Sequence, residues 1–171
     1  MNLSEFLNEQ FDADQIEIQD FTPAPEDWYM LMIDKSSIKP TKTGGKMLVL
    51  EMKIVAGDHE NKRVTENLNL VNTNDEAVRI AKETLAKLCK AVDVKRPTDT
   101  AQLHNKPFFG YLIVGSYSKV GEDGKSVEKK KNELKKIMSV EQFQEQAAKN
   151  RTEEAAGSKS DAFKTPSWMA K

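Results

Sequence analysis

Lysine side chains gather in two turns of the sequence, where they could bind a chain of phosphates. The first cluster lies in Lys39-Pro40-Thr41-Lys42-Thr43-Gly44-Gly45-Lys46, with no acid nearby, and the second spans residues 119–131 around a glycine-containing turn. A lysine that pairs with a phosphate releases counterions, so clustered lysines favour polyanion binding. The candidate phosphate contacts are Lys39, Lys42, Lys46, Lys53, Lys62, Arg63, Lys119, Lys129, Lys130 and Lys131.

Aromatic side chains near these clusters could stack on nucleic-acid bases. Stacking of one base on one ring contributes roughly 1 to 3 kcal/mol and is tolerant of sequence. The candidates are Trp28, Phe108, Tyr111 and Tyr117. The first three have apolar neighbours, which favours packing in the core over stacking. Tyr117 borders the second lysine cluster, and both interpretations are open for it.

No set of residues predicts an enzyme. Thr43-Gly44-Gly45-Lys46 lacks the upstream glycine and the following Ser or Thr of a phosphate-binding loop. The two histidines, His59 and His104, have no Cys or His at metal-ligand spacing. Cys89 lies beside the apolar stripe of a helical pattern, as a small buried side chain does. We therefore expect no catalytic residue, no metal and no cofactor.

Charge is distributed unevenly along the 171 residues, although the net charge is only -1. Residues 1–34 carry nine acids and no Lys or Arg, residues 35–140 carry 21 bases and 13 acids, and residues 141–171 carry five of each. A basic middle beside an acidic arm is typical of a protein that binds a polyanion, with the arm shielding the basic face. A lysine-rich surface that only maintains solubility is the open alternative.

The elements that must position these side chains follow from hydrophobic periodicity. Alternation of apolar and polar residues predicts strands, and apolar residues at helical spacing predict a helix between the third and fourth strands. The chain is thus mainly β with helices, in the order of a five-stranded OB-type barrel, whose second and third strands and whose two hairpin loops bind oligonucleotides. The expected strands are 28–33, 47–55, 62–70, 108–117 and the later half of 125–140, and the expected helices are 1–12, 73–93 and 140–151.

Three segments are expected from composition. Residues 1–20 form an acidic arm with a short helix, residues 21–140 form the OB-type domain, and residues 141–171 form a C-terminal helix and a flexible tail. Trp168 and Met169 near the chain end predict either a peptide that docks on a partner or an unstructured tail, and both interpretations are open.

Several short motifs resemble a family of small bacteriophage early proteins, long labelled only as a domain of unknown function and found among phage replication and recombination functions. The resemblance covers about residues 18–140 and implies an OB-type protein that binds single-stranded DNA. It supplies no agreed set of binding residues, and the acidic C-terminal tail of better-known single-strand binding proteins is missing. The motifs are Phe21-Thr22-Pro23-Ala24-Pro25, Trp28-Tyr29, Lys39-Pro40-Thr41-Lys42-Thr43-Gly44-Gly45, Asn67-Leu68-Asn69-Leu70-Val71-Asn72 and Leu88-Cys89-Lys90-Ala91-Val92.

We therefore expect a protein that is not an enzyme and binds single-stranded DNA in the host cell cytoplasm. Strands 47–55 and 62–70 form a hairpin, and the DNA is expected to cross its outward face, above Lys53 and Arg63. Candidate further partners are phage or host replication and recombination proteins and a second copy of the chain, and no membrane segment is expected. The alternative is an adaptor that binds a protein partner through the OB-type domain and the terminal segments.

Overall fold

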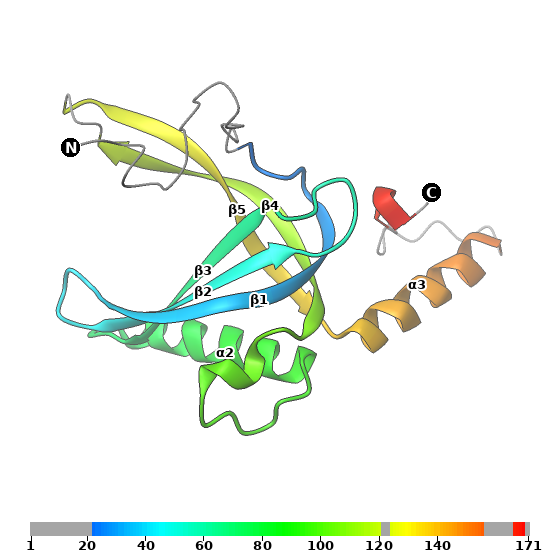
Figure 1. Cartoon of the computed structure of the whole chain (residues 1–171), viewed down its shortest axis with the longest axis horizontal. Helices are drawn as coiled ribbons and strands as arrows, with labels where there is room; N and C mark the ends of the chain where they lie inside the picture. Colours follow the sequence, from blue (N-terminus) through cyan, green and yellow to red (C-terminus); the bar gives the residue numbers. More distant parts are fainter. Residues whose placement is uncertain (1–21, 121–123, 156–165, 170–171) are drawn as a thin grey trace, which may run out of the picture.

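The computed structural model describes residues 22–120, 124–155 and 166–169. A single antiparallel sheet with strand order β3-β2-β1-β4-β5 dominates these residues (Figure 1). The strands are β1 (Asp27–Pro40), β2 (Lys46–Ile54), β3 (Arg63–Val71), β4 (Pro107–Val120) and β5 (Ser126–Met138). The helical elements are α2 (Asp75–Ala91), α3 (Val140–Ala155) and the short 3-10 helices η2 (Thr100–Leu103) and η3 (Ser167–Met169).

Alternation of apolar residues builds the main core on one face of the sheet. Leu48, Leu50, Met52 and Ile54 of β2 are all buried on this face, as their spacing predicts. Helix α2 covers the face with Ala81, Leu88 and Cys89 (Figure 1). Its first turn is capped by Asn74, whose side-chain oxygen accepts hydrogen bonds from the backbone N–H of Glu76 at 3.0 Å and of Ala77 at 3.2 Å.

A smaller apolar cluster lies on the opposite face of the sheet, where α3 packs. Phe143 of α3 stacks on Phe109 of β4 with the ring centroids 3.6 Å apart, and it meets Trp28 edge to face at 5.6 Å. Beyond this first part, α3 projects away from the sheet (Figure 1). The order of three strands, one helix, two strands and a last helix is the predicted order. The predicted acidic arm, residues 1–20, lies outside the described residues.

The OB-type barrel that the sequence predicted is not confirmed, because the five-stranded sheet does not close on itself. β3 and β5 are its two edges, and no described residue of one strand pairs with the other, although the strands lie close to each other. The outer half of the β4–β5 hairpin pairs only with itself, because β1 begins at Asp27, which lies opposite Leu112. No helix within the described ranges is long and apolar enough to cross a membrane.

Candidate nucleic-acid interface

A groove of about 330 Å³ crosses the gap between the edge strands β3 and β5. It brings together three residues that the sequence predicted separately as binding residues: Arg63, Tyr117 and Lys131. Period-two alternation along β3 places Arg63 on the same face as two neutral polar side chains, Thr65 and Asn67. The groove therefore combines two cations, one aromatic ring, two exposed hydrogen-bonding side chains and the buried amide of Asn132. Its full lining is Arg63, Val64, Thr65, Asn67, Tyr117, Lys131 and Asn132.

Tyr117 and Lys131 enter the groove from the two strands of one hairpin. In the register of β4 and β5, Tyr117 lies opposite Lys129 and Gly115 lies opposite Lys131, so the tyrosine and Lys131 are diagonal neighbours on one face. Tyr117 is 41% exposed, and its ring contacts no other aromatic ring of the described residues. Its face is thus available to a flat ligand. Lys131 forms an ion pair with Glu133 at 3.3 Å.

The outward face of the β2–β3 hairpin is balanced in charge, which differs from the basic face expected there. Asp34 lies 3.8 Å from Lys53 and 3.6 Å from Arg63, and Glu51 lies 3.6 Å from Arg63. Two acids thus accompany the two cations that were expected to lie beneath DNA. All four side chains are partly exposed, and such pairs contribute only about 0 to 1 kcal/mol. A phosphate that approaches this face must compete with these carboxylates.

The first lysine cluster surrounds the tight β1–β2 loop. Lys39 lies within β1 and Lys46 begins β2, so only Lys42 is in the loop itself. All three lysines are exposed and form no ion pair with a described residue. The loop is held by hydrogen bonds of 2.9 Å from Thr41 N–H to the Gly45 carbonyl and from Gly45 N–H to Thr41 Oγ1.

The second lysine cluster lies on the outer half of the β4–β5 hairpin. Lys119, Lys129 and Lys130 are exposed there and form no ion pair with the described part of the chain. The outer ends of the β1–β2 and β4–β5 hairpins point to the same side of the molecule, at the left of Figure 1. Lys62 has a different role, because its Nζ donates a 2.8 Å hydrogen bond to the backbone carbonyl of Thr22.

Three of the four aromatic candidates are not free to stack. Phe108 is 0% exposed in the main core, and Trp28 is 4% exposed beneath α3. Tyr111 is half-buried, meets Trp28 edge to face at 5.6 Å, and has Lys136 Nζ 5.8 Å from its ring centroid. The structure thus places these rings in packing roles and leaves Tyr117 as the exposed one.

Glu66 is a feature of the gap that sequence reasoning did not single out. Its carboxyl lies on the apolar face of β3, and burial raises the pKa to about 7, from an ordinary value of 4.5. Of the nearby charges, Lys131 and Lys135 lower the pKa and Glu133 raises it. The signal was present in the sequence, because alternation places Glu66 on the same face as Val64 and Leu68.

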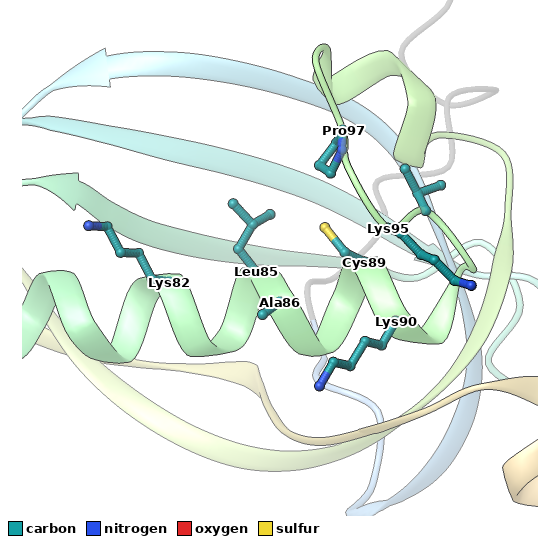
Figure 2. A pocket seen from close by; sticks show the side chains of 8 residues that line it. Lys82, Leu85, Ala86, Cys89, Lys90, Lys95 and Pro97 are labelled. Atoms are coloured by element: carbon teal, nitrogen blue, oxygen red, sulfur yellow. The ribbon is translucent and has the colours of Figure 1, made fainter.

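A second hollow, of about 530 Å³, lies beside α2 and is mostly apolar (Figure 2). Leu85 and Cys89 rise from one side of the helix toward Pro97 (Figure 2), with lysines at the rim. Burial raises the pKa of the Cys89 thiol, which disfavours the reactive thiolate. Across the described ranges, no three His, Cys, Asp or Glu side chains are placed to hold a metal ion.

These observations define a mainly β module whose polar groove crosses an open sheet edge. A family model described as "Protein of unknown function (DUF669)" matches residues 9–150. The chain belongs to this family. No curated protein matches the chain. The family description assigns no activity, so the functional argument rests on the groove and the charges around it.

Proposed function

We propose that this chain binds single-stranded nucleic acid, with single-stranded DNA as the ligand and no catalytic step. The observation that carries the proposal is the β3–β5 groove, where Arg63 and Lys131 lie beside the exposed ring of Tyr117. Cations that follow the phosphates and a ring that stacks on a base are the two components of single-strand binding. The setting in phage replication or recombination, in the host cytoplasm, rests on the resemblance of the sequence motifs alone.

The order of strands supports an OB-type relationship. In the OB-fold the first strand pairs with the second and the fourth, and the fifth strand approaches the third to close the barrel. Here β1 pairs with β2 and β4, and the helix α2 follows β3. The sheet thus has the order of an OB barrel that is open between β3 and β5. In this arrangement the groove occupies the opening itself, between β3 and the lysine-bearing β4–β5 hairpin.

Binding through this surface has a specific physical form. Five of the cations that the sequence predicted as phosphate contacts lie in the groove or on the outer half of its hairpin, namely Arg63, Lys119, Lys129, Lys130 and Lys131. If each contacts one phosphate, the logarithm of the affinity falls with the logarithm of the salt concentration with a slope of roughly -3.5. Thr65 and Asn67 offer hydrogen bonds to base edges, and the exposed ring of Tyr117 favours stacking without sequence preference.

A fluorescence-anisotropy titration with labelled oligo-dT, repeated over a series of salt concentrations, tests the proposal. Tyr117→Ala removes the ring and is expected to weaken binding roughly 5- to 150-fold, which corresponds to the stacking energy of about 1 to 3 kcal/mol. Tyr117→Phe keeps the ring and is the matched control that retains affinity. Absence of binding by the wild-type chain at low salt would overturn the proposal.

An adaptor that binds a protein is the second candidate, because β3 and β5 are sheet edges that pair with no further strand among the described residues. Val120 and Val127 are large apolar side chains that lie exposed near the end of the β4–β5 hairpin. An extended peptide could add a strand beside β3 or β5 through backbone hydrogen bonds. Partner capture that survives Lys39→Glu, Lys42→Glu and Lys46→Glu together, with no DNA binding by the wild type, would favour this function.

A further inference from the structure

The C-terminal 3-10 helix η3 returns to the body of the protein and inserts Trp168 into a slot beside the small aromatic cluster. The indole Nε1 donates a 2.8 Å hydrogen bond to the backbone carbonyl of Trp28. The indole also lies nearly parallel to the ring of Phe109, at 10° and 6.3 Å between centroids. The slot thus recognises both the flat face and the N–H group of the indole.

Gly57, in the turn between β2 and β3, forms the remaining wall of the slot. Its φ of +93° is a conformation that favours glycine. A Cβ atom at this position would lie 3.0 Å from Cγ and 3.1 Å from Cδ2 of Trp168, which is too close without movement of the indole. The absence of a side chain at Gly57 therefore creates the space that the indole fills.

The residues that flank the two partners in the sequence are opposite in charge. Lys164 and Lys171 flank Trp168 in the sequence. On the receiving side, Asp27 precedes Trp28, while Asp58 and Glu60 follow Gly57. Basic residues thus flank the indole in the sequence, and acidic residues flank the residues that contact it. Opposite charges on two binding surfaces favour their encounter and orient them.

The slot itself belongs to the sheet and not to the helix that precedes the tail. Trp28 lies in β1, Gly57 follows β2 and Phe109 lies in β4, whereas α3 ends at Ala155 and ten residues separate it from Pro166. Ten residues span up to about 35 Å, so the tail reaches the slot of its own chain. The same tether permits a neighbouring copy to be reached. In dilute solution the intramolecular contact predominates over the contact between copies, because the effective concentration of a tethered peptide is about millimolar.

We propose that the Trp28–Gly57–Phe109 slot is a receptor for the peptide of residues 164–171, and that a second copy of this chain can supply that peptide. The tail occupies the slot of its own copy at low protein concentration. At high concentration it exchanges between copies, which would join them into a linear assembly. This exchange does not depend on DNA binding.

Peptide binding provides the first test. Trp168→Ala, made in the full chain, empties the slot, and a fluorescent peptide of residues 164–171 should then bind and raise its anisotropy. The wild-type chain should bind the same peptide at least about tenfold more weakly, because its own tail competes. The matched control peptide carries Ala in place of Trp168 and should not bind. Equal binding of the peptide to the wild type and to Trp168→Ala, or no binding to either, would overturn the receptor.

Two complementary variants provide the test of exchange. Gly57→Val keeps the tail and blocks the slot, whereas Trp168→Ala keeps the slot and loses the tail. Neither variant can pair with itself through this contact, but a mixture of the two should form a heterodimer in sedimentation-velocity runs at about 0.1 to 1 mM of each. Circular dichroism checks that Gly57→Val is folded. If Gly57→Val does not fold, the wild-type chain replaces it as the donor of the tail. The wild-type chain then carries a cross-linker at Lys171 and is mixed with Trp168→Ala. A mixture that sediments as two monomers would overturn the exchange.

Discussion

Replacement of Glu66 by glutamine is expected to stabilise the protein at neutral and alkaline pH and to have a small effect at acid pH. Burial raises the pKa of Glu66 to about 7 in the folded protein, from an ordinary value of 4.5. At a pH between these two pKa values, the folded state holds the proton of the Glu66 carboxyl more tightly than the unfolded state does. The free energy of unfolding therefore falls as the pH rises through this window, and the loss is complete above pH 7.

The difference between an ordinary pKa of 4.5 and a folded pKa of about 7 corresponds to about 3 kcal/mol, an upper value for a carboxyl beside an open groove. Glutamine has a similar shape and no charge, so the Glu66→Gln variant avoids this penalty. The advantage of the variant over the wild type is expected to grow by roughly 2 to 3 kcal/mol between about pH 5 and about pH 8.

Urea unfolding at several pH values, followed by circular dichroism, measures this difference directly. Glu60→Gln is the matched control, because it removes the same charge from an exposed position in the β2–β3 turn. The control should show an advantage that changes little over the same pH range. An advantage of Glu66→Gln that is constant from about pH 5 to about pH 8 would refute the assignment of a partly buried, destabilising carboxylate.

Two further substitutions test contacts around the groove. Asn132 is buried and its side chain exchanges two 2.8 Å hydrogen bonds with the backbone N–H and carbonyl of Ala24, so Asn132→Ala should lower the free energy of unfolding by about 2 to 4 kcal/mol. Asn67→Ala, at an exposed position, provides the control. Equal midpoint temperatures of thermal unfolding for Asn132→Ala and Asn67→Ala would contradict the role of these hydrogen bonds. Asp34→Asn removes the acid shared by Lys53 and Arg63 and should tighten binding of oligo-dT several-fold at low salt, with the gain lost at high salt. A gain that persists at high salt would show that it is not electrostatic.

The order and type of the elements could be predicted from the sequence because they depend on local periodicity. Two strands are markedly longer than predicted, since β1 spans Asp27–Pro40 against an expected 28–33, and β5 spans Ser126–Met138 against the later half of 125–140. Alternation in residues 47–55 and 62–70 predicted the hairpin and its buried face, and helical spacing predicted α2 between β3 and β4. The prediction that Tyr117 borders a basic surface also depends only on neighbours in the chain. These features need no knowledge of which strands meet.

The charge balance of the outward face could not be predicted, because it depends on cross-strand register. The pairing of β1 with β2 shifts between Ile33 and Lys35, so Asp34 is an extra residue in a bulge. This bulge lies where Asp34 reaches Lys53 and Arg63 on the neighbouring strands. Nothing in the sequence pattern around residue 34 marks the shift. Hydrophobic periodicity also does not predict the contact of Trp168 with Trp28, which lies 140 residues earlier in the sequence.

Closure of the sheet is a further property that periodicity does not determine, and Glu66 offers a physical reason for the open edge. Pairing of β3 with β5 would remove more water from a carboxyl that burial already disfavours, and it would hold Glu66 near Glu133. We infer that the charge of Glu66 opposes closure at neutral pH. Closure would narrow the groove that Arg63, Tyr117 and Lys131 line, so on this inference the same charge would favour access of a ligand. Stability lost at Glu66 and access to the groove are in this view two effects of one partly buried carboxylate.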